Sequence, residues 1–95
     1  MEFLINIRIQ WPHDLQADER DALSVRERAR AAELARLGHL VRMWRVPGRW
    51  ENWGLWRAAD ATEMHEIISS LPVWPYMDVT VIALAAHAVD PGAAG

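Results

Sequence analysis

Glu27 is the residue that the sequence places best for proton-transfer chemistry. Residues 15–37 are rich in Ala, Arg, Glu and Leu and lack Gly and Pro, which predicts a long helix. One apolar arc of this helix is formed by Leu23, Ala31, Leu34 and Leu37. Glu27 falls within the arc, where partial desolvation would raise the pKa of its carboxyl toward a value useful for a general base. The alternative is a solvated Glu27 that is paired with Arg20 or Arg30 of the same helix.

Three polar side chains outside this helix could hold an oxygen-bearing substrate. Asn52 and Tyr76 are candidate hydrogen-bond donors to a carbonyl or enolate oxygen. Arg45 could bind a carboxylate through the two parallel N–H groups of its guanidinium. Each residue also has an ordinary structural alternative. Asn52 could serve a nearby backbone group, Tyr76 could be a buried phenol, and Arg45 could form an ion pair with Asp78.

Tryptophan is unusually frequent, with six residues against one Tyr and one Phe. These bulky side chains usually need a partner for the indole N–H, so several are expected to line a pocket or a subunit interface. Trp44, Trp50 and Trp56 are the candidates for substrate contact. Strand alternation predicts that Trp50 and Trp56 share a face with Asn52 and Gly54. Packing in the core or at an interface is the alternative for each of them.

The elements that must position these residues follow from the periodicity of the chain. Residues 2–11 alternate between apolar and polar, which predicts a strand with one buried face that ends at Pro12. The long helix is expected to stop at Gly38, the usual residue after a helix C-terminus. Residues 39–46 and 49–58, separated by Pro-Gly, are predicted to form a β-hairpin.

A second helix and a last strand complete the predicted fold. Asp60 has the character of an N-cap, and Glu63 completes a capping-box-like pair before a short apolar helix. Residues 76–86 then form a strand. The order β-α-β-β-α-β predicts an α+β, ferredoxin-like sandwich with a four-stranded antiparallel sheet and two helices on one face. We expect one domain over 1–87 and a disordered tail over 88–95.

Composition excludes several classes of function. A formal net charge of −3 gives no basis for binding nucleic acid or an anionic membrane surface. There is no cysteine for a disulfide or a thiolate site, no secretory signal, and no apolar run of roughly 20 residues. We therefore expect a soluble, cytoplasmic protein. The four histidines lack metal-site spacing, so no metal is predicted. The bare sheet face and the small size favour a homo-oligomer.

Two segments carry a resemblance to a known family. Residues 43–52, Met-Trp-Arg-Val-Pro-Gly-Arg-Trp-Glu-Asn, are similar to the hairpin pattern LWR-x-x-G-x-Y-x-N of the muconolactone isomerase family. Residues 71–79, Leu-Pro-Val-Trp-Pro-Tyr-Met-Asp-Val, resemble that family's LPLFPYMDIEV segment. The pattern extends over residues 1–87 without a gap. The chain is therefore identified as resembling this family along most of its length.

The resemblance implies a particular activity. It implies a cofactor-free isomerase that acts on a small unsaturated lactone and shifts a double bond in aromatic degradation. The resemblance implies a decamer, while the bare sheet face alone is also compatible with a dimer. Such a 1,3-proton shift needs a base, an acid and donors that stabilise the dienolate, and one carboxylate can act as both base and acid. The resemblance points to Glu27 for this role.

The chain also departs from the family pattern. The family's Y-x-N-x-S-x-F-D strand has Trp50, Gly54 and Arg57 at the positions of its Tyr, Ser and Asp, and Trp56 at that of its Phe. These changes leave two alternatives open. One is a relative recruited to secondary metabolism as an isomerase, cyclase or lyase on a larger polyketide-like substrate. The other is a non-catalytic oligomeric binding protein. The motif match disfavours a cofactor-free oxygenase on the same fold.

Overall fold

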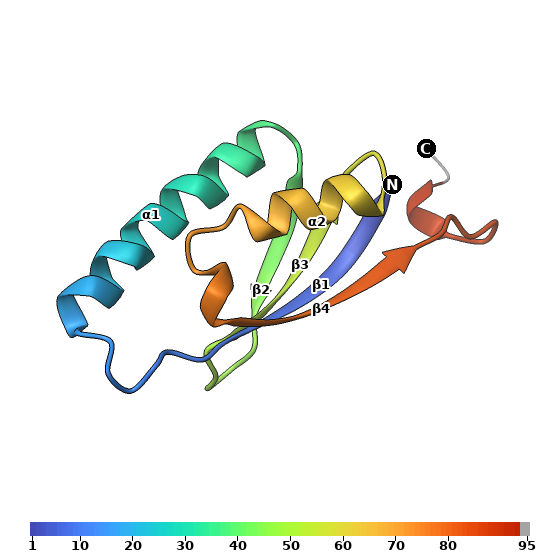
Figure 1. Ribbon diagram of the computed structural model, residues 1–95. Coiled ribbons are helices and arrows are strands. Elements are labelled where there is room, and N and C mark those ends of the chain that lie inside the picture. The colour runs from blue at the N-terminus through green and yellow to red at the C-terminus, as the bar shows by residue number, and fades with distance from the viewer. Residues whose placement is uncertain (94–95) are drawn as a thin grey trace.

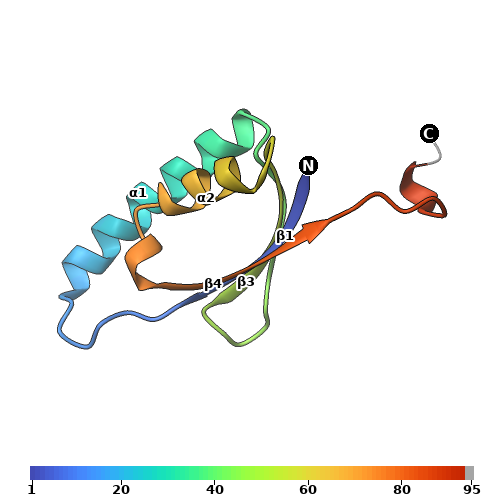
Figure 2. The ribbon, with the colours of Figure 1, turned by 45° about the vertical axis from the view of Figure 1, so that its right-hand side comes forward.

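Two helices cover one face of a four-stranded antiparallel sheet (Figure 1). The computed structural model describes residues 1–93, and the strands lie in the order β2-β3-β1-β4. The elements are β1 (Glu2–Ile9), α1 (Ala17–Arg36), β2 (Leu40–Arg45), β3 (Glu51–Arg57), α2 (Ala61–Ser69), η1 (Trp74–Tyr76), β4 (Met77–Leu84) and η2 (Pro91–Ala93). The predicted ferredoxin-like βαββαβ arrangement is confirmed, and Figure 2 shows both helices on the same side of the curved sheet.

β1 supplies the centre of the core, as its alternation predicts. It pairs with β3 on one side and β4 on the other, so its inward residues meet side chains from both neighbours. Phe3, Ile5 and Ile7 are almost fully buried under the helices. Burying each such side chain contributes roughly 1.5–3 kcal/mol. Because β1 is anchored in this way, the strands beside it have a defined register against the helices.

α1 ends where Gly38 was expected to stop it. Gly38 adopts a φ of 85°, a left-handed conformation that a glycine takes without steric cost. Its N–H donates to the carbonyl of Ala35 at 3.1 Å, and the N–H of His39 donates to the carbonyl of Leu34 at 2.9 Å. These two bonds form a Schellman motif. The helix therefore stops before Leu37, which is 63% exposed and does not face the sheet as the predicted arc required.

The N-terminus of α2 has the predicted reciprocal cap. Asp60 Oδ1 accepts a hydrogen bond from the N–H of Glu63 at 2.8 Å, and Glu63 Oε1 accepts one from the N–H of Ala59 at 2.9 Å. The first bond satisfies a backbone donor that the helix end leaves without a partner, and the second ties the residue before the N-cap to the first turn. The cap thus holds the start of α2 against the end of β3.

Replacing this cap should cost a measurable part of the stability. We expect Asp60→Ala to lower the free energy of unfolding by about 1 kcal/mol, because the N–H of Glu63 would lose its acceptor. Urea unfolding followed by circular dichroism would measure the change. Asp14→Ala, at an exposed carboxylate before α1, is the matched control and should change little. An equal loss in both variants would contradict a specific capping role.

Within residues 1–93, no helix covers the second face of the sheet. Leu4, Trp44 and Trp53 lie on this uncovered face, as their cross-strand pairings place them opposite the buried side of each strand. No helix in the stretch 1–93 has the length and apolarity needed to cross a membrane. Beyond β4 the chain leads away from the sheet toward η2 (Figures 1 and 2). The tail predicted over 88–95 lies partly outside the described residues, and its domain boundary stays a prediction.

Candidate functional site

A cavity of about 630 Å³ lies between α1 and the helix-covered side of β1, β2 and β3. This volume is in the range that binds small organic ligands. Its wall includes apolar side chains of β1 and of the segment that follows α2. Its polar and aromatic lining consists of Trp11, Arg20, Asp21, Ser24, Glu27, Arg28, Arg45, Trp50, Glu51, Asn52 and Trp56. The fold thus brings residues of five separate segments around one space.

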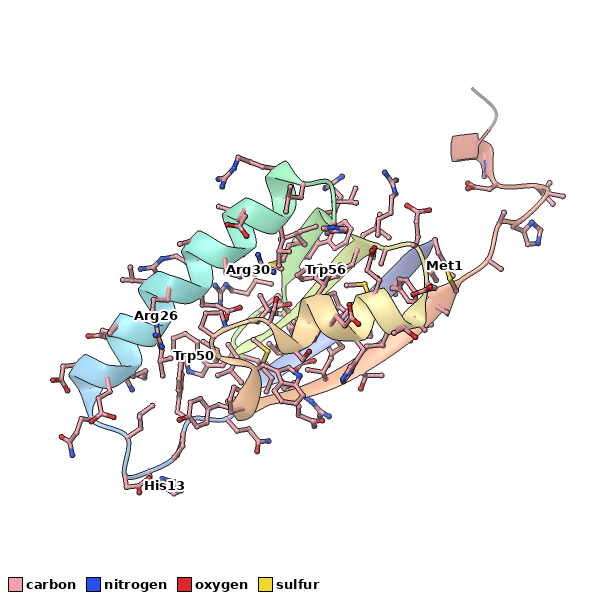
Figure 3. The ribbon with its side chains drawn as sticks, turned by 45° about the horizontal axis from the view of Figure 1, so that its top comes forward. Met1, His13, Arg26, Arg30, Trp50 and Trp56 are labelled. Atoms are coloured by element: carbon pink, nitrogen blue, oxygen red, sulfur yellow. The ribbon has the colours of Figure 1, made fainter. Side chains whose placement is uncertain are left out.

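Five of the seven predicted site residues line this cavity. They are Glu27, Arg45, Trp50, Asn52 and Trp56. The helix brings Glu27 over the sheet, and the hairpin brings Arg45 directly opposite Asn52 in the β2–β3 pairing. Asn52, Gly54 and Trp56 occupy alternate positions of β3, and Trp50 directly precedes the strand. Trp50 and Trp56 are labelled in Figure 3.

A β-bulge decides which face of β2 meets the cavity. The β2–β3 register shifts between Leu40 and Arg42, so one extra residue stands in β2. A bulge reverses the alternation of every side chain that follows it. Met43 and Arg45 therefore point to the helix-covered side and line the cavity. Without the bulge, the side chain of Arg45 would lie on the uncovered face.

The same bulge removes Trp44 from the predicted site. Trp44 pairs with Trp53 on the uncovered face and is 45% exposed. The guanidinium of Arg42 lies 5.0 Å from the centroid of its ring, a cation–π contact. Trp44 is therefore separated from Glu27 by the thickness of the sheet and does not contact the cavity of its own chain.

Tyr76 also lies outside the cavity lining. It belongs to η1, and its ring centroid is 5.7 Å from that of Trp11, which does line the cavity. Tyr76 therefore supports the wall behind Trp11. Its phenol is one aromatic ring away from the space that a ligand would occupy.

Several lining residues were missed in the sequence. Trp11 continues the inward alternation of Ile7 and Ile9, so strand periodicity could have identified it. Arg20 lies seven residues before Glu27, two helical turns away on the same face. Met43 had no such signal, because the bulge that turns it inward is not visible in the hydrophobic pattern.

Glu27 is half-buried and is held by the backbone. Its Oε1 accepts a hydrogen bond from the N–H of Val73 at 2.9 Å. Arg30, one of the partners considered for it, instead pairs with Glu33 and donates to Ser70. Burial raises the pKa of Glu27, and the Val73 hydrogen bond lowers it by less. The carboxyl therefore has the raised basicity that proton abstraction requires.

Guanidinium and carboxylate groups line the cavity in equal number, with Asp21, Glu27 and Glu51 as the carboxylates. Arg20, Arg28 and Arg45 all line it. The ion pairs found within residues 1–93 use other arginines, namely Arg8, Arg30, Arg49 and Arg57. A ligand with a carboxylate would thus meet guanidiniums that form no ion pair within the described residues. The described part of the chain contains no cluster of three metal-binding side chains.

Two buried polar atoms on β3 have no hydrogen-bond partner. They are Oδ1 of Asn52 and Nε1 of Trp56. Gly54 is the one inward-facing position of β3 that lies between these two residues. Both residues line the cavity. A buried polar group without a partner is costly and needs an explanation.

Comparison with known proteins identifies relatives over more than nine-tenths of the chain. The family described as muconolactone delta-isomerase matches residues 1–90. The chain is 33% identical to a muconolactone delta-isomerase of Cupriavidus pinatubonensis over 87 residues, which covers 92% of this chain and 95% of the relative. It is 33% identical over 88 residues to that of Rhodococcus opacus, with coverage of 93% and 95%. A crystal structure of muconolactone isomerase superimposes with a TM-score of 0.89 at 26% identity, covering 96% of this chain and 95% of that one.

Proposed function

The chain belongs to the muconolactone delta-isomerase family, and on that premise we propose that it is an intramolecular isomerase that shifts a double bond in a muconolactone-like lactone by proton transfer. The observation that carries this proposal is the position of Glu27. A half-buried carboxylate of raised pKa lines a cavity of ligand size, together with polar side chains of the sheet that faces α1. No cofactor is required by this chemistry.

Glu27 acts as base and then as acid in the proposed reaction. Its carboxylate removes a proton from the saturated ring carbon next to the double bond that is conjugated with the lactone carbonyl. The electron pair moves into the ring, the double bond shifts, and negative charge reaches the carbonyl oxygen. The carboxylic acid of Glu27 then returns the proton to the carbon next to the carbonyl. Atoms and electrons balance, because the proton only changes its carbon.

The remaining polar residues orient the substrate. Arg45 lies opposite Asn52 on the neighbouring strand, and its guanidinium suits the carboxylate of the substrate. The amide of Asn52 suits an oxygen of the lactone. The N–H of Val73 restrains the carboxyl of Glu27 in one orientation. Trp50 and Trp56 form part of the wall around the ring.

Proton NMR in deuterated buffer tests the proposal directly. We expect the purified protein to convert muconolactone to the enol-lactone with incorporation of deuterium at the migrating position. Exchange would show that a solvent-exchangeable acid of the protein carries the proton. The absence of both turnover and exchange by folded protein would contradict the proposal, and larger lactones would then be tried.

The pH dependence of the reaction should follow Glu27. The base must be ionised, so kcat/KM is expected to fall about tenfold per pH unit below the pKa of the free enzyme's base. Because burial raises the pKa of Glu27, the fall should begin at a higher pH than for an ordinary glutamate. A pH profile of kcat/KM would measure this. A profile that stays flat down to the ordinary range of glutamate would contradict the assignment.

We also propose a homo-oligomer, either a dimer or a decamer, located in the cytoplasm. The uncovered sheet face supports the homo-oligomer, since Trp44 and Ile82 are exposed there. Burial of this apolar surface against another copy would remove it from water. The absence of cysteine fits a reducing compartment. Sedimentation velocity would give the oligomeric state.

A further inference from the structure

Gly54 and Trp56 form a coupled pair on β3. A Cβ atom built on Gly54 would lie 2.5 Å from Nε1 of Trp56 and 3.0 Å from its Cδ1. Real side chains do not approach so closely, so any other residue at position 54 would displace the indole. The edge of the ring that carries the N–H therefore occupies the place of a side chain at position 54.

The indole N–H has no partner in this position. The side chain of Trp56 is only 1% exposed, and its Nε1 has no hydrogen-bond partner. Tryptophan N–H groups are normally hydrogen-bonded when they are buried. The residue nevertheless lines the cavity, with the unpartnered Oδ1 of Asn52 two residues beyond Gly54. A buried donor that lacks an acceptor and borders a cavity calls for an acceptor from that cavity.

We propose that the indole N–H of Trp56 donates a hydrogen bond to the carbonyl oxygen of the substrate lactone, and that Gly54 is the positioning residue that makes room for it. This inference rests on the proposed function. This carbonyl oxygen gains negative charge in the dienolate, so the hydrogen bond from the indole becomes stronger as the reaction proceeds. Met43, opposite Gly54 on β2, is an unbranched side chain that can adjust around the ligand.

The departure from the family pattern has a consistent explanation in this pair. Where the family pattern has Ser and Phe, this chain has Gly54 and Trp56. A serine hydroxyl and a tryptophan N–H are both donors, and the indole edge reaches the space that the serine side chain would occupy. The exchange thus removes one donor and supplies another in the same region, with more ring surface against the substrate.

Kinetics of three variants test the coupling. Trp56→Phe should lower kcat for muconolactone by about 10²-fold, as expected for the loss of one donor to a developing oxyanion. The double variant Gly54→Ser with Trp56→Phe restores a hydroxyl and should recover at least about tenfold of that loss. Trp53→Phe, on the uncovered face, is the matched control and should leave kcat unchanged. Equal kcat in the single and double variants would contradict the coupling.

A binding measurement tests the donor without relying on turnover. The probe is 5-oxotetrahydrofuran-2-acetate, the saturated lactone that has no double bond to move. In the ¹H–¹⁵N spectrum of the wild-type protein, the indole signal of Trp56, assigned by its loss in Trp56→Phe, should move downfield as the probe is added. The signal of Trp53 should not move.

The outcomes separate this inference from the proposed function. A downfield shift of the Trp56 signal supports the hydrogen bond, and if muconolactone is not isomerised, only the proposed function is overturned. A Trp56 signal that stays in place overturns the inference, whether the probe moves the signal of Trp50 or moves none. Isomerisation of muconolactone in that case would leave the proposed function intact.

Discussion

Glu27→Gln is expected to lower kcat for muconolactone isomerisation by about 10²- to 10⁴-fold, which is the usual contribution of general acid–base catalysis. Glutamine has the shape of glutamate but cannot take up the proton. Its Oε1 can still accept the hydrogen bond from the N–H of Val73 that holds Glu27 at 2.9 Å. The geometry of the cavity should therefore survive the change. Steady-state kinetics in a coupled or NMR assay would measure the loss.

The control for this variant is Glu33→Gln. Glu33 lies on the same helix, is exposed and pairs with Arg30. Its replacement should leave kcat within about twofold of wild type, since exposed ion pairs contribute little. Unchanged turnover in Glu27→Gln, or an equal loss in both variants, would exclude Glu27 as the base.

Stability should distinguish a catalytic from a structural role of Glu27. A raised carboxyl pKa in the folded state favours folding at low pH, and this contribution is lost as the pH rises through the folded value. Glutamine has no charge to desolvate. We therefore expect Glu27→Gln to be at least as stable as wild type at pH 8 in urea unfolding. A clear loss of stability there would indicate that the carboxylate holds the fold.

Arg45→Met should raise KM for muconolactone by about 10- to 100-fold, with a much smaller effect on kcat. A hydrogen bond to a charged group contributes about 1.5–3 kcal/mol, and the substrate carboxylate would lose two such donors. The carboxylate does not react, so its contact is similar in the ground state and the transition state. Initial rates over a range of substrate concentrations would separate KM from kcat.

The neighbouring Arg42 provides the control for this change. It lies on the same strand but faces the uncovered side, over the ring of Trp44. Arg42→Met should leave KM near the wild-type value. If Arg42→Met raises KM as much as Arg45→Met, the effect comes from overall charge or from assembly, and Arg45 does not bind the carboxylate.

Local patterns in the sequence determined the helices and strands and several of the residues at which they begin or end. Alternation over 2–11 predicts β1 because side chains on a strand point to opposite faces. Gly38 marks the end of α1 because glycine takes the left-handed conformation that closes a helix. Asp60 marks the start of α2 because its side chain accepts a hydrogen bond from a backbone N–H of the first turn. Each of these effects acts over a few residues, so it can be read along the chain. The inward position of Glu27 on its helix has the same origin.

The tertiary structure decided which side chains surround the cavity. The bulge in β2 turns Arg45 inward and Trp44 outward, and it depends on hydrogen bonds to β3. The bond from Val73 to Glu27 joins residues 46 positions apart. The position of the Trp56 indole depends on the space that Gly54 leaves on the helix-covered face. These features arise from pairing and close packing between distant segments, and no periodicity along one segment contains that information.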